Sequence, residues 1–174
     1  MRRHQSPTAG RAGARLLLRD PASAARVREA GIAGVTEAAD IVFLDERRND
    51  AEIAPMLERI GGPFALLNAS GLVARTVDQV PEYGRVIEHV RGLGLRPVML
   101  PHVLRDSADD RAACRAVAEA VGGDAVLIDE ALAPSTIRAL AAKADVTVTG
   151  RMHLAIMSLS QGTPAVTLAT QGKV

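Results

Sequence analysis

Between residues 64 and 168, short runs of apolar and β-branched residues alternate with longer segments of helical character. Strands this short and this apolar, when helices separate them, are typical of a parallel sheet that is covered on both faces. We therefore predict an α/β fold with a doubly wound parallel sheet. The expected strands are residues 64–67, 97–100, 125–128, 145–149 and 165–168, and the expected helices are residues 81–91, 109–121, 134–142 and 151–161.

The chain before this sheet follows a different pattern. Asp20 is expected to cap a helix over residues 21–30, with Pro21 at its first position. Short strands are expected on either side of this helix, and a short helix is expected further on. The expected strands are residues 15–18 and 41–44, and the expected short helix lies within residues 52–60. The expected organisation is a flexible Arg-rich tail (1–14), a remnant of a first domain with its linker (15–60), and a Rossmann-like domain that lacks its last helices (61–174).

The composition excludes several classes of protein. Across 174 residues the net charge is +1, which argues against a strongly basic nucleic-acid binder. Aromatic residues make up only 2% of the chain, too few to build a stacking platform for bases or sugars. The single cysteine, Cys114, excludes an internal disulfide and a cysteine-based zinc cluster and fits a reducing compartment. With neither a membrane span nor a signal peptide in the sequence, we expect a cytoplasmic protein.

The predicted sheet indicates where a ligand would bind. In open parallel sheets, ligands bind in the crevice beyond the carboxyl ends of the strands. The polar residues that follow these ends are therefore expected to share one edge of the sheet. They are Asn68, Ser70, His102, Asp129, Glu130, Gly150, Arg151, His153 and Lys173.

The loop before the helix at residues 151–161 is the richest of these segments. Gly150 allows close approach of the backbone to a ligand, and the following helix start offers N–H groups to an anion. A cation such as Arg151 is disfavoured at this position, and a bound anion would explain it. The alternative is that Arg151 and His153 pair with neighbouring acids. His153 could act as a general acid or base, or it could be a satisfied core histidine.

Four motifs then give a resemblance to a known family. Arg151-Met152-His153 at the helix start, followed by Gly162-Thr163-Pro164, resembles the polysaccharide pyruvyl transferase family. Three further stretches agree with that family in order and spacing. They are Asn68-Ala69-Ser70-Gly71, Pro101-His102 followed by Asp109-Asp110, and Arg19-Asp20-Pro21-Ala22-Ser23. Two departures are Met152 in place of a leucine, and the absence of an aromatic residue shortly before Lys173.

The resemblance implies transfer of a pyruvyl group from phosphoenolpyruvate to two hydroxyls of a sugar, which forms a ketal and releases phosphate. It implies half of a two-domain, glycosyltransferase-B-like fold that serves cell-envelope or exopolysaccharide synthesis. Arg151 and His153 carry over as catalytic and donor-binding residues. The substrate-binding candidates are Arg19, Asn68, Ser70, His102, Gly150 and Lys173.

The same resemblance sets the expected ligands. Phosphoenolpyruvate is the donor substrate, and neither a cofactor nor a metal is expected. The acceptor is a glycan or a lipid-linked sugar, nucleic acid is not a partner, and a homo-oligomer is compatible with the sequence. Two other interpretations stay open: a half-domain of a nucleotide-sugar glycosyltransferase or epimerase, which would bind uridine nucleotides, and an inactive, truncated anion-binding fragment.

Overall fold

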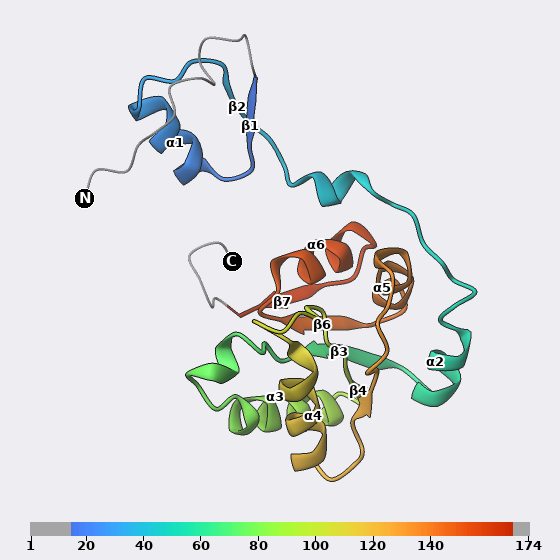
Figure 1. Ribbon diagram of the computed structural model, residues 1–174. Coiled ribbons are helices and arrows are strands. Elements are labelled where there is room, and N and C mark those ends of the chain that lie inside the picture. Colours follow the sequence, from blue (N-terminus) through green and yellow to red (C-terminus); the bar gives the residue numbers. More distant parts are fainter. Residues whose placement is uncertain (1–14, 169–174) are drawn as a thin grey trace. The chain divides into compact units, whose positions relative to one another are not determined.

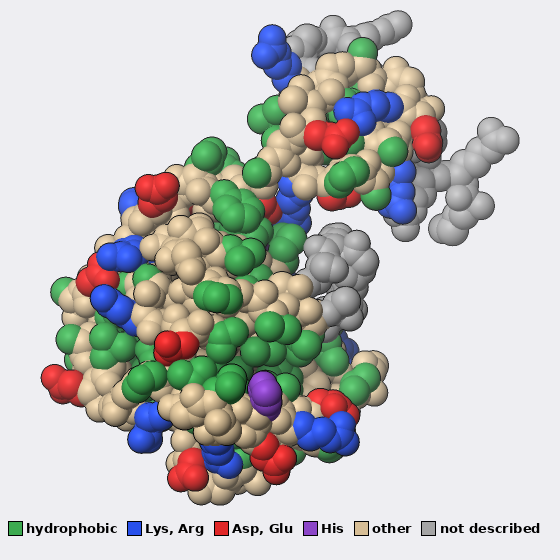
Figure 2. Space-filling model, turned by 180° about the vertical axis from the view of Figure 1, so that it is seen from behind, with side chains coloured by type: hydrophobic (Ala, Val, Ile, Leu, Met, Phe, Trp, Pro, Cys, Tyr) green, Lys and Arg blue, Asp and Glu red, His purple; other side chains and the backbone are tan. Residues whose placement is uncertain are grey.

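The computed structural model describes residues 15–168 and divides the chain into two compact units, Met1–Leu44 and Asp45–Val174. The expected tail at residues 1–14 and Lys173 lie outside the described residues. None of the helices within the described part of the chain is long and apolar enough to cross a membrane. On the face drawn in Figure 2, acidic and basic side chains are interspersed rather than gathered by sign.

The first unit contains a small parallel strand pair and one crossover helix. Strand β1 (Leu16–Leu18) is followed by helix α1 (Pro21–Glu29), and β1 pairs in parallel with strand β2 (Val35–Glu37). The Asp20 side chain accepts a hydrogen bond of 2.7 Å from the Ser23 amide and so caps α1, as predicted.

The predicted strand at residues 41–44 is wrong. This segment is the 3-10 helix η1 (Ile41–Leu44), and the sequence pattern missed β2. The local reason is Asp40, whose side chain accepts from the Val42 amide at 3.0 Å and whose carbonyl accepts from the Phe43 amide at 3.1 Å. These bonds turn the backbone immediately, so that the apolar run does not extend into a strand.

The second unit contains a five-stranded sheet with every strand parallel, in the order β5-β4-β3-β6-β7. This confirms the predicted Rossmann-like α/β fold. The strands are β3 (Phe64–Asn68), β4 (Arg96–Met99), β5 (Val126–Leu127), β6 (Val146–Thr149) and β7 (Ala165–Thr167). The helices are α2 (Ala54–Ile60), the 3-10 turn η2 (Val73–Arg75), α3 (Val80–Gly92), α4 (Asp110–Ala120), α5 (Pro134–Ala141) and α6 (Met152–Ser160).

The strand order reverses beside β3. The chain runs outward from β3 through β4 to β5, and then returns to place β6 and β7 on the other side of β3. Helices α3 and α4 lie together on one side of the sheet, and α5 and α6 lie on the other (Figure 1). In the register, Asn68 at the end of β3 lies opposite Thr149 at the end of β6. These two residues therefore mark the switch point, where such sheets open a crevice.

The core explains why the strand pattern could be recognised in the sequence. All five residues of β3 are buried, because the strand is central and covered on both faces. One face packs Ala65 and Leu67 against α3 and α4, in a cluster that includes Ile87 and Cys114. Burial raises the pKa of the Cys114 thiol to about 12, so this cysteine is a core residue at neutral pH.

The second unit begins at Asp45 because the segment before α2 is tied to α5. The buried guanidinium of Arg138 pairs with Asp45 at 3.1 Å. The Asn49 amide donates to the Ser135 carbonyl at 3.2 Å, and the Thr136 hydroxyl bonds to the Glu52 carboxylate. Residues 45–60, which the sequence suggested as part of a linker, therefore pack as part of the sheet unit.

Candidate functional site

Several residues at the carboxyl edge of the sheet donate hydrogen bonds to one side chain, Asp110. Asp110 is the first residue of α4, and Asp109 precedes it as the N-cap. The residues that donate to the Asp110 carboxylate lie at the end of β3 or in the loops that follow β3, β4 and β6. They are Asn68, Gly71, His102, Val103 and Arg151, which together with Asp110 we call the Asp110 cluster.

The two carboxylate oxygens of Asp110 divide these donors between them. Oδ1 accepts from the Gly71 amide at 2.8 Å and from Nη2 of Arg151. Oδ2 accepts from Nδ2 of Asn68 at 3.1 Å, from the amides of His102 and Val103 at 3.2 and 3.0 Å, and from Nε of Arg151 at 3.1 Å. The side chain is fully buried. A buried carboxylate with this many donors is satisfied, as a stable buried charge must be.

These contacts decide the charge of Asp110. Burial alone raises the pKa of the carboxyl group. The hydrogen bonds from Arg151, Gly71, Val103 and Asn68 act in the opposite direction and leave its pKa below the ordinary value. Asp110 is therefore ionised at neutral pH and serves purely as an acceptor.

Gly71 lies where a side chain cannot fit. A Cβ atom at this position would lie 1.9 Å from the carbonyl oxygen of Asp109 and 3.1 Å from the Asp110 amide nitrogen. The turn after β3 thus packs its backbone directly against the start of α4. This close approach explains the glycine in Asn68-Ala69-Ser70-Gly71, because a larger residue would separate the Gly71 amide from Asp110.

Asn68 connects the switch point to the cluster. Its Nδ2 donates to the Leu100 carbonyl at 2.9 Å as well as to Asp110, and its Oδ1 accepts from the Thr149 hydroxyl at 3.2 Å. The Thr149 oxygen in turn accepts from the Arg151 amide at 2.9 Å. Tyr83, which the sequence reasoning missed, donates its hydroxyl to the Asn68 carbonyl. Asn68 is 0% exposed, and its side chain links the end of β3 to Thr149 at the end of β6 and to Leu100 just after β4.

Arg151 is held along one edge of its guanidinium group. Its Nε and Nη2 atoms face Asp110, and Nη2 also donates to the Ala108 carbonyl at 3.3 Å. Within residues 15–168 no hydrogen bond to a protein acceptor is found for Nη1. The sequence left open whether Arg151 binds an anion or pairs with an acid. The structure shows the ion pair, and Nη1 is the part of the guanidinium that can still donate to a ligand.

Two histidines lie near this guanidinium. The pKa of His102 is lowered to about 4, mainly by burial; Asp110 acts to raise it, and His153 and Arg151 act to lower it. His102 is therefore neutral at pH 7, and its Nδ1 atom is buried without a hydrogen-bond partner in the described structure. His153 follows Met152 in the first turn of α6, and its side chain is exposed. An exposed imidazole can exchange protons with a bound molecule.

The remaining predicted site residues have other surroundings. Ser70 is buried, and its hydroxyl accepts from the Val73 amide at 3.4 Å, which closes the turn. Gly150 joins β6 to α6 at the same edge. Arg19 lies in the first unit and pairs there with Asp40. Asp129 pairs with Arg115 and Glu130 with Arg59, and these four side chains are partly exposed.

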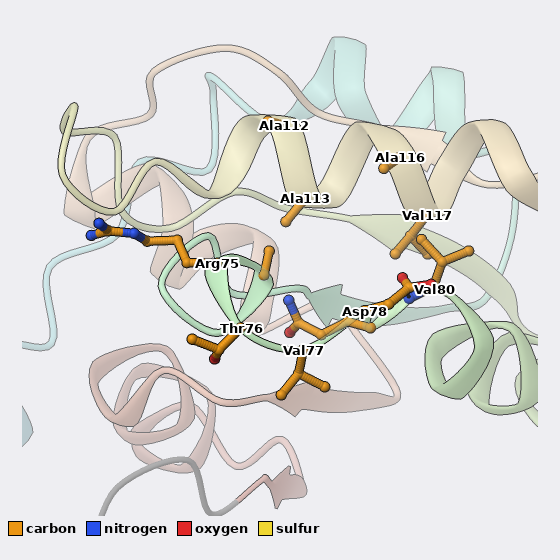
Figure 3. Close-up of a pocket in the computed structure, with 11 residues that line it drawn as sticks. Arg75, Thr76, Val77, Asp78, Val80, Ala112, Ala113, Ala116 and Val117 are labelled. Atoms are coloured by element: carbon orange, nitrogen blue, oxygen red, sulfur yellow. Dashed lines mark hydrogen bonds between the residues drawn. The ribbon is translucent and has the colours of Figure 1, made fainter.

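A groove of about 420 Å³ lies beside the cluster, between η2 with its following loop and α4. Figure 3 shows Ala112, Ala113, Ala116 and Val117 along the α4 wall. Gln79 lines the groove and also bonds Ser70, donating to its carbonyl at 2.8 Å and accepting from its amide at 3.1 Å. The groove thus adjoins the turn after β3, but its lining residues do not include the histidines or Arg151.

The edge has the parts of an anion site. Helix α6 has no side-chain cap at its N-terminus, so that its first amide groups and its dipole face the loop of Arg151. Among the described residues, no group of three or more His, Cys, Asp or Glu residues could hold a metal ion.

A family model described as polysaccharide pyruvyl transferase matches residues 8–172. No curated protein matches the chain.

Proposed function

Because the chain belongs to the polysaccharide pyruvyl transferase family, we propose that it transfers the pyruvyl group of phosphoenolpyruvate to a glycan and that the edge around Arg151 binds this donor. The observation that carries the proposal is the convergence of Arg151, His102, His153 and the uncapped start of α6 at the switch point. Family membership supports pyruvyl transfer to polysaccharides, and the edge supports the identity of the donor.

The donor chemistry fits this edge. Phosphoenolpyruvate carries a phosphate and a carboxylate, and both accept hydrogen bonds from N–H groups. Nη1 of Arg151 can donate to one anionic group, and the first amides of α6 can donate to the other. Neutral His102 can donate one hydrogen bond without adding charge.

The reaction needs a proton at carbon. In the proposed first step, His153 protonates the methylene carbon of phosphoenolpyruvate, and positive charge develops on the adjacent carbon. The oxygen of one sugar hydroxyl then attacks this adjacent carbon. A second hydroxyl of the same sugar then replaces phosphate at this carbon and closes the ketal. The two hydroxyl protons are accounted for, since one restores His153 and the other leaves with phosphate. Arg151 stabilises the negative charge of the leaving phosphate.

The proposal is tested by measuring phosphate release from phosphoenolpyruvate with a panel of glycans that present 1,2- or 1,3-diols. We expect release that depends on the glycan, together with a new ketal methyl signal in the NMR spectrum of the product. His153→Gln should lower kcat by about 100-fold or more while donor affinity changes little, because a general acid acts in the transition state. His89→Gln, on the exposed side of α3, is the matched control and should leave kcat unchanged.

Two results would contradict the proposal. Glycan-dependent phosphate release that persists in His153→Gln would remove His153 from the mechanism. Binding of uridine diphosphate, with no binding of phosphoenolpyruvate, would favour a nucleotide-sugar enzyme instead.

A further inference from the structure

We propose that Asp110 is a positioning residue for donor binding: its carboxylate holds the Nε/Nη2 edge of Arg151 so that Nη1 is presented to the anion. The inference rests on the proposed function, because it takes phosphoenolpyruvate as the ligand of Arg151. It goes further by assigning to the site a residue that touches neither phosphoenolpyruvate nor the glycan and that acts through Arg151.

A guanidinium group is planar and can be fixed by two parallel hydrogen bonds along one edge. Asp110 makes this pair of bonds, with Nε donating to Oδ2 at 3.1 Å and Nη2 donating to Oδ1. Once this edge is held, the direction of the Nη1 donors is fixed as well. An arginine on a flexible side chain would otherwise lose rotamer freedom when the donor binds.

Within residues 15–168, each of the six hydrogen bonds that reach the Asp110 carboxylate comes from an N–H group. The position therefore requires a group that only accepts, and at this side-chain length only an ionised aspartate does so. An asparagine of the same shape would turn an NH2 group toward donors and would leave at least one of them without an acceptor.

The Asp110 carboxylate joins loops that follow three different strands. Gly71 follows β3, His102 and Val103 follow β4, and Arg151 follows β6. Asp110 thus fixes Arg151 relative to the loop that carries His102, and the first turn of α6 carries His153 two residues after Arg151. A structural residue would need to satisfy the backbone amides alone, whereas this one also sets the direction of the charged group.

The charge balance adds a consequence. The negative charge of Asp110 offsets the positive charge of Arg151, and His102 is neutral at pH 7. The charges within the Asp110 cluster therefore offset one another, and attraction of an anion by Arg151 depends on the direction of Nη1. Arg151→Lys should be a poor substitute, because an ammonium group that faces Asp110 has no second edge for the donor.

The test restores the missing guanidinium from solution. Arg151→Ala should weaken binding of phosphoenolpyruvate by about 30-fold or more, since a charge-assisted contact is lost. Guanidinium chloride at low millimolar concentration should then recover much of the affinity, measured by calorimetry. Methylammonium chloride at equal ionic strength is the control and should not, because it lacks the planar edge that fits Asp110. Equal recovery with both cations, or with neither, would overturn the proposal.

A second variant removes Asp110 from the comparison. In Arg151→Ala combined with Asp110→Asn, guanidinium should give no recovery, with far-UV circular dichroism used to verify the fold. The Nε–H signal of Arg151 gives a readout that needs no donor: it should be protected from solvent exchange in the wild-type chain and lose this protection in Asp110→Asn.

The role of Asp110 in holding Arg151 and the binding of phosphoenolpyruvate can each be contradicted without the other. A protected Nε–H signal that survives Asp110→Asn would overturn the positioning role, whatever the donor. A wild-type chain that does not bind phosphoenolpyruvate, with the Nε–H signal behaving as described, would overturn the proposed function and leave the role of Asp110 in holding Arg151 supported.

Discussion

Replacing Gly71 with alanine should destabilise the second unit strongly, although the change adds a single methyl group. The new Cβ would lie 1.9 Å from the Asp109 carbonyl oxygen and 2.5 Å from its carbon, both of them backbone atoms at the start of α4. Relief requires that the turn and the helix move apart, and overpacking of this kind costs about 1 to 3 kcal/mol. That movement also breaks the 2.8 Å bond from the Gly71 amide to the buried Asp110 carboxylate, which is worth about 1.5 to 3 kcal/mol.

The two effects together predict a loss of about 2.5 to 6 kcal/mol in the free energy of unfolding, a large part of the stability of an ordinary domain. The assay is urea unfolding followed by far-UV circular dichroism, since the chain has no tryptophan. Gly84→Ala is the matched control. It lies inside α3, a Cβ there meets nothing within 4 Å, and alanine should stabilise the helix by about 0.5 to 1 kcal/mol.

Urea unfolding of Gly71→Ala beside the wild-type chain tests directly whether the turn after β3 packs against α4. If Gly71→Ala unfolds within about 0.5 kcal/mol of the wild-type chain, the turn after β3 does not pack against α4 as described. The Asp110 cluster would then lack the close approach on which its geometry depends.

Two further predictions concern pH. The unfolded chain takes up a proton on His102 near its ordinary pKa of 6.5, whereas the folded chain does so only near pH 4, so stability should fall as the pH drops between these values. His102→Gln should flatten this part of the profile, and an unchanged slope in thermal unfolding between pH 6.5 and 4 would contradict it. Folding lowers the pKa of Asp110 below its unfolded value of 3.8. Asp110 therefore stabilises the folded chain above pH 3.8, and this stabilisation is lost as the pH falls through the lower pKa of the folded state. Asp110→Asn should be less stable than the wild-type chain at pH 7, and its stability should change less than that of the wild-type chain below pH 4; a profile parallel to that of the wild-type chain would contradict this.

Much of the second unit could be predicted from the sequence, for a physical reason. Its strands are buried by helices on both faces, and burial of this kind selects short apolar runs that stand out between helices. Residues 64–67, for example, were predicted as a strand, and Phe64–Asn68 is the buried central strand. The first unit offers a weaker signal. Residues 41–44 are as apolar as a strand, but the side-chain and main-chain bonds to Asp40 turn them into a 3-10 helix.

The sequence predicts that polar residues at the strand ends share one edge of the sheet, but it does not predict that Asp110 joins them. The rule for strand ends selected Asn68, His102 and Arg151, and the structure brings these three residues together. In the sequence, Asp110 stands out only as one of two acids after His102. Locally, an aspartate pair at a helix start indicates a cap, and Asp109 does supply that cap by accepting from the Arg111 amide at 2.9 Å. The partners of Asp110 are up to 42 residues away, so only the fold reveals its role.

The central claim is that the edge around Arg151 binds phosphoenolpyruvate. The most direct measurement is a calorimetric titration of the wild-type chain with phosphoenolpyruvate and, separately, with uridine diphosphate at the same ionic strength. The account predicts saturable binding of phosphoenolpyruvate at one site per chain, weakened by about 30-fold or more in Arg151→Ala, and no comparable binding of uridine diphosphate. Binding of phosphoenolpyruvate that is unchanged in a folded Arg151→Ala chain, or a preference for uridine diphosphate, would contradict it.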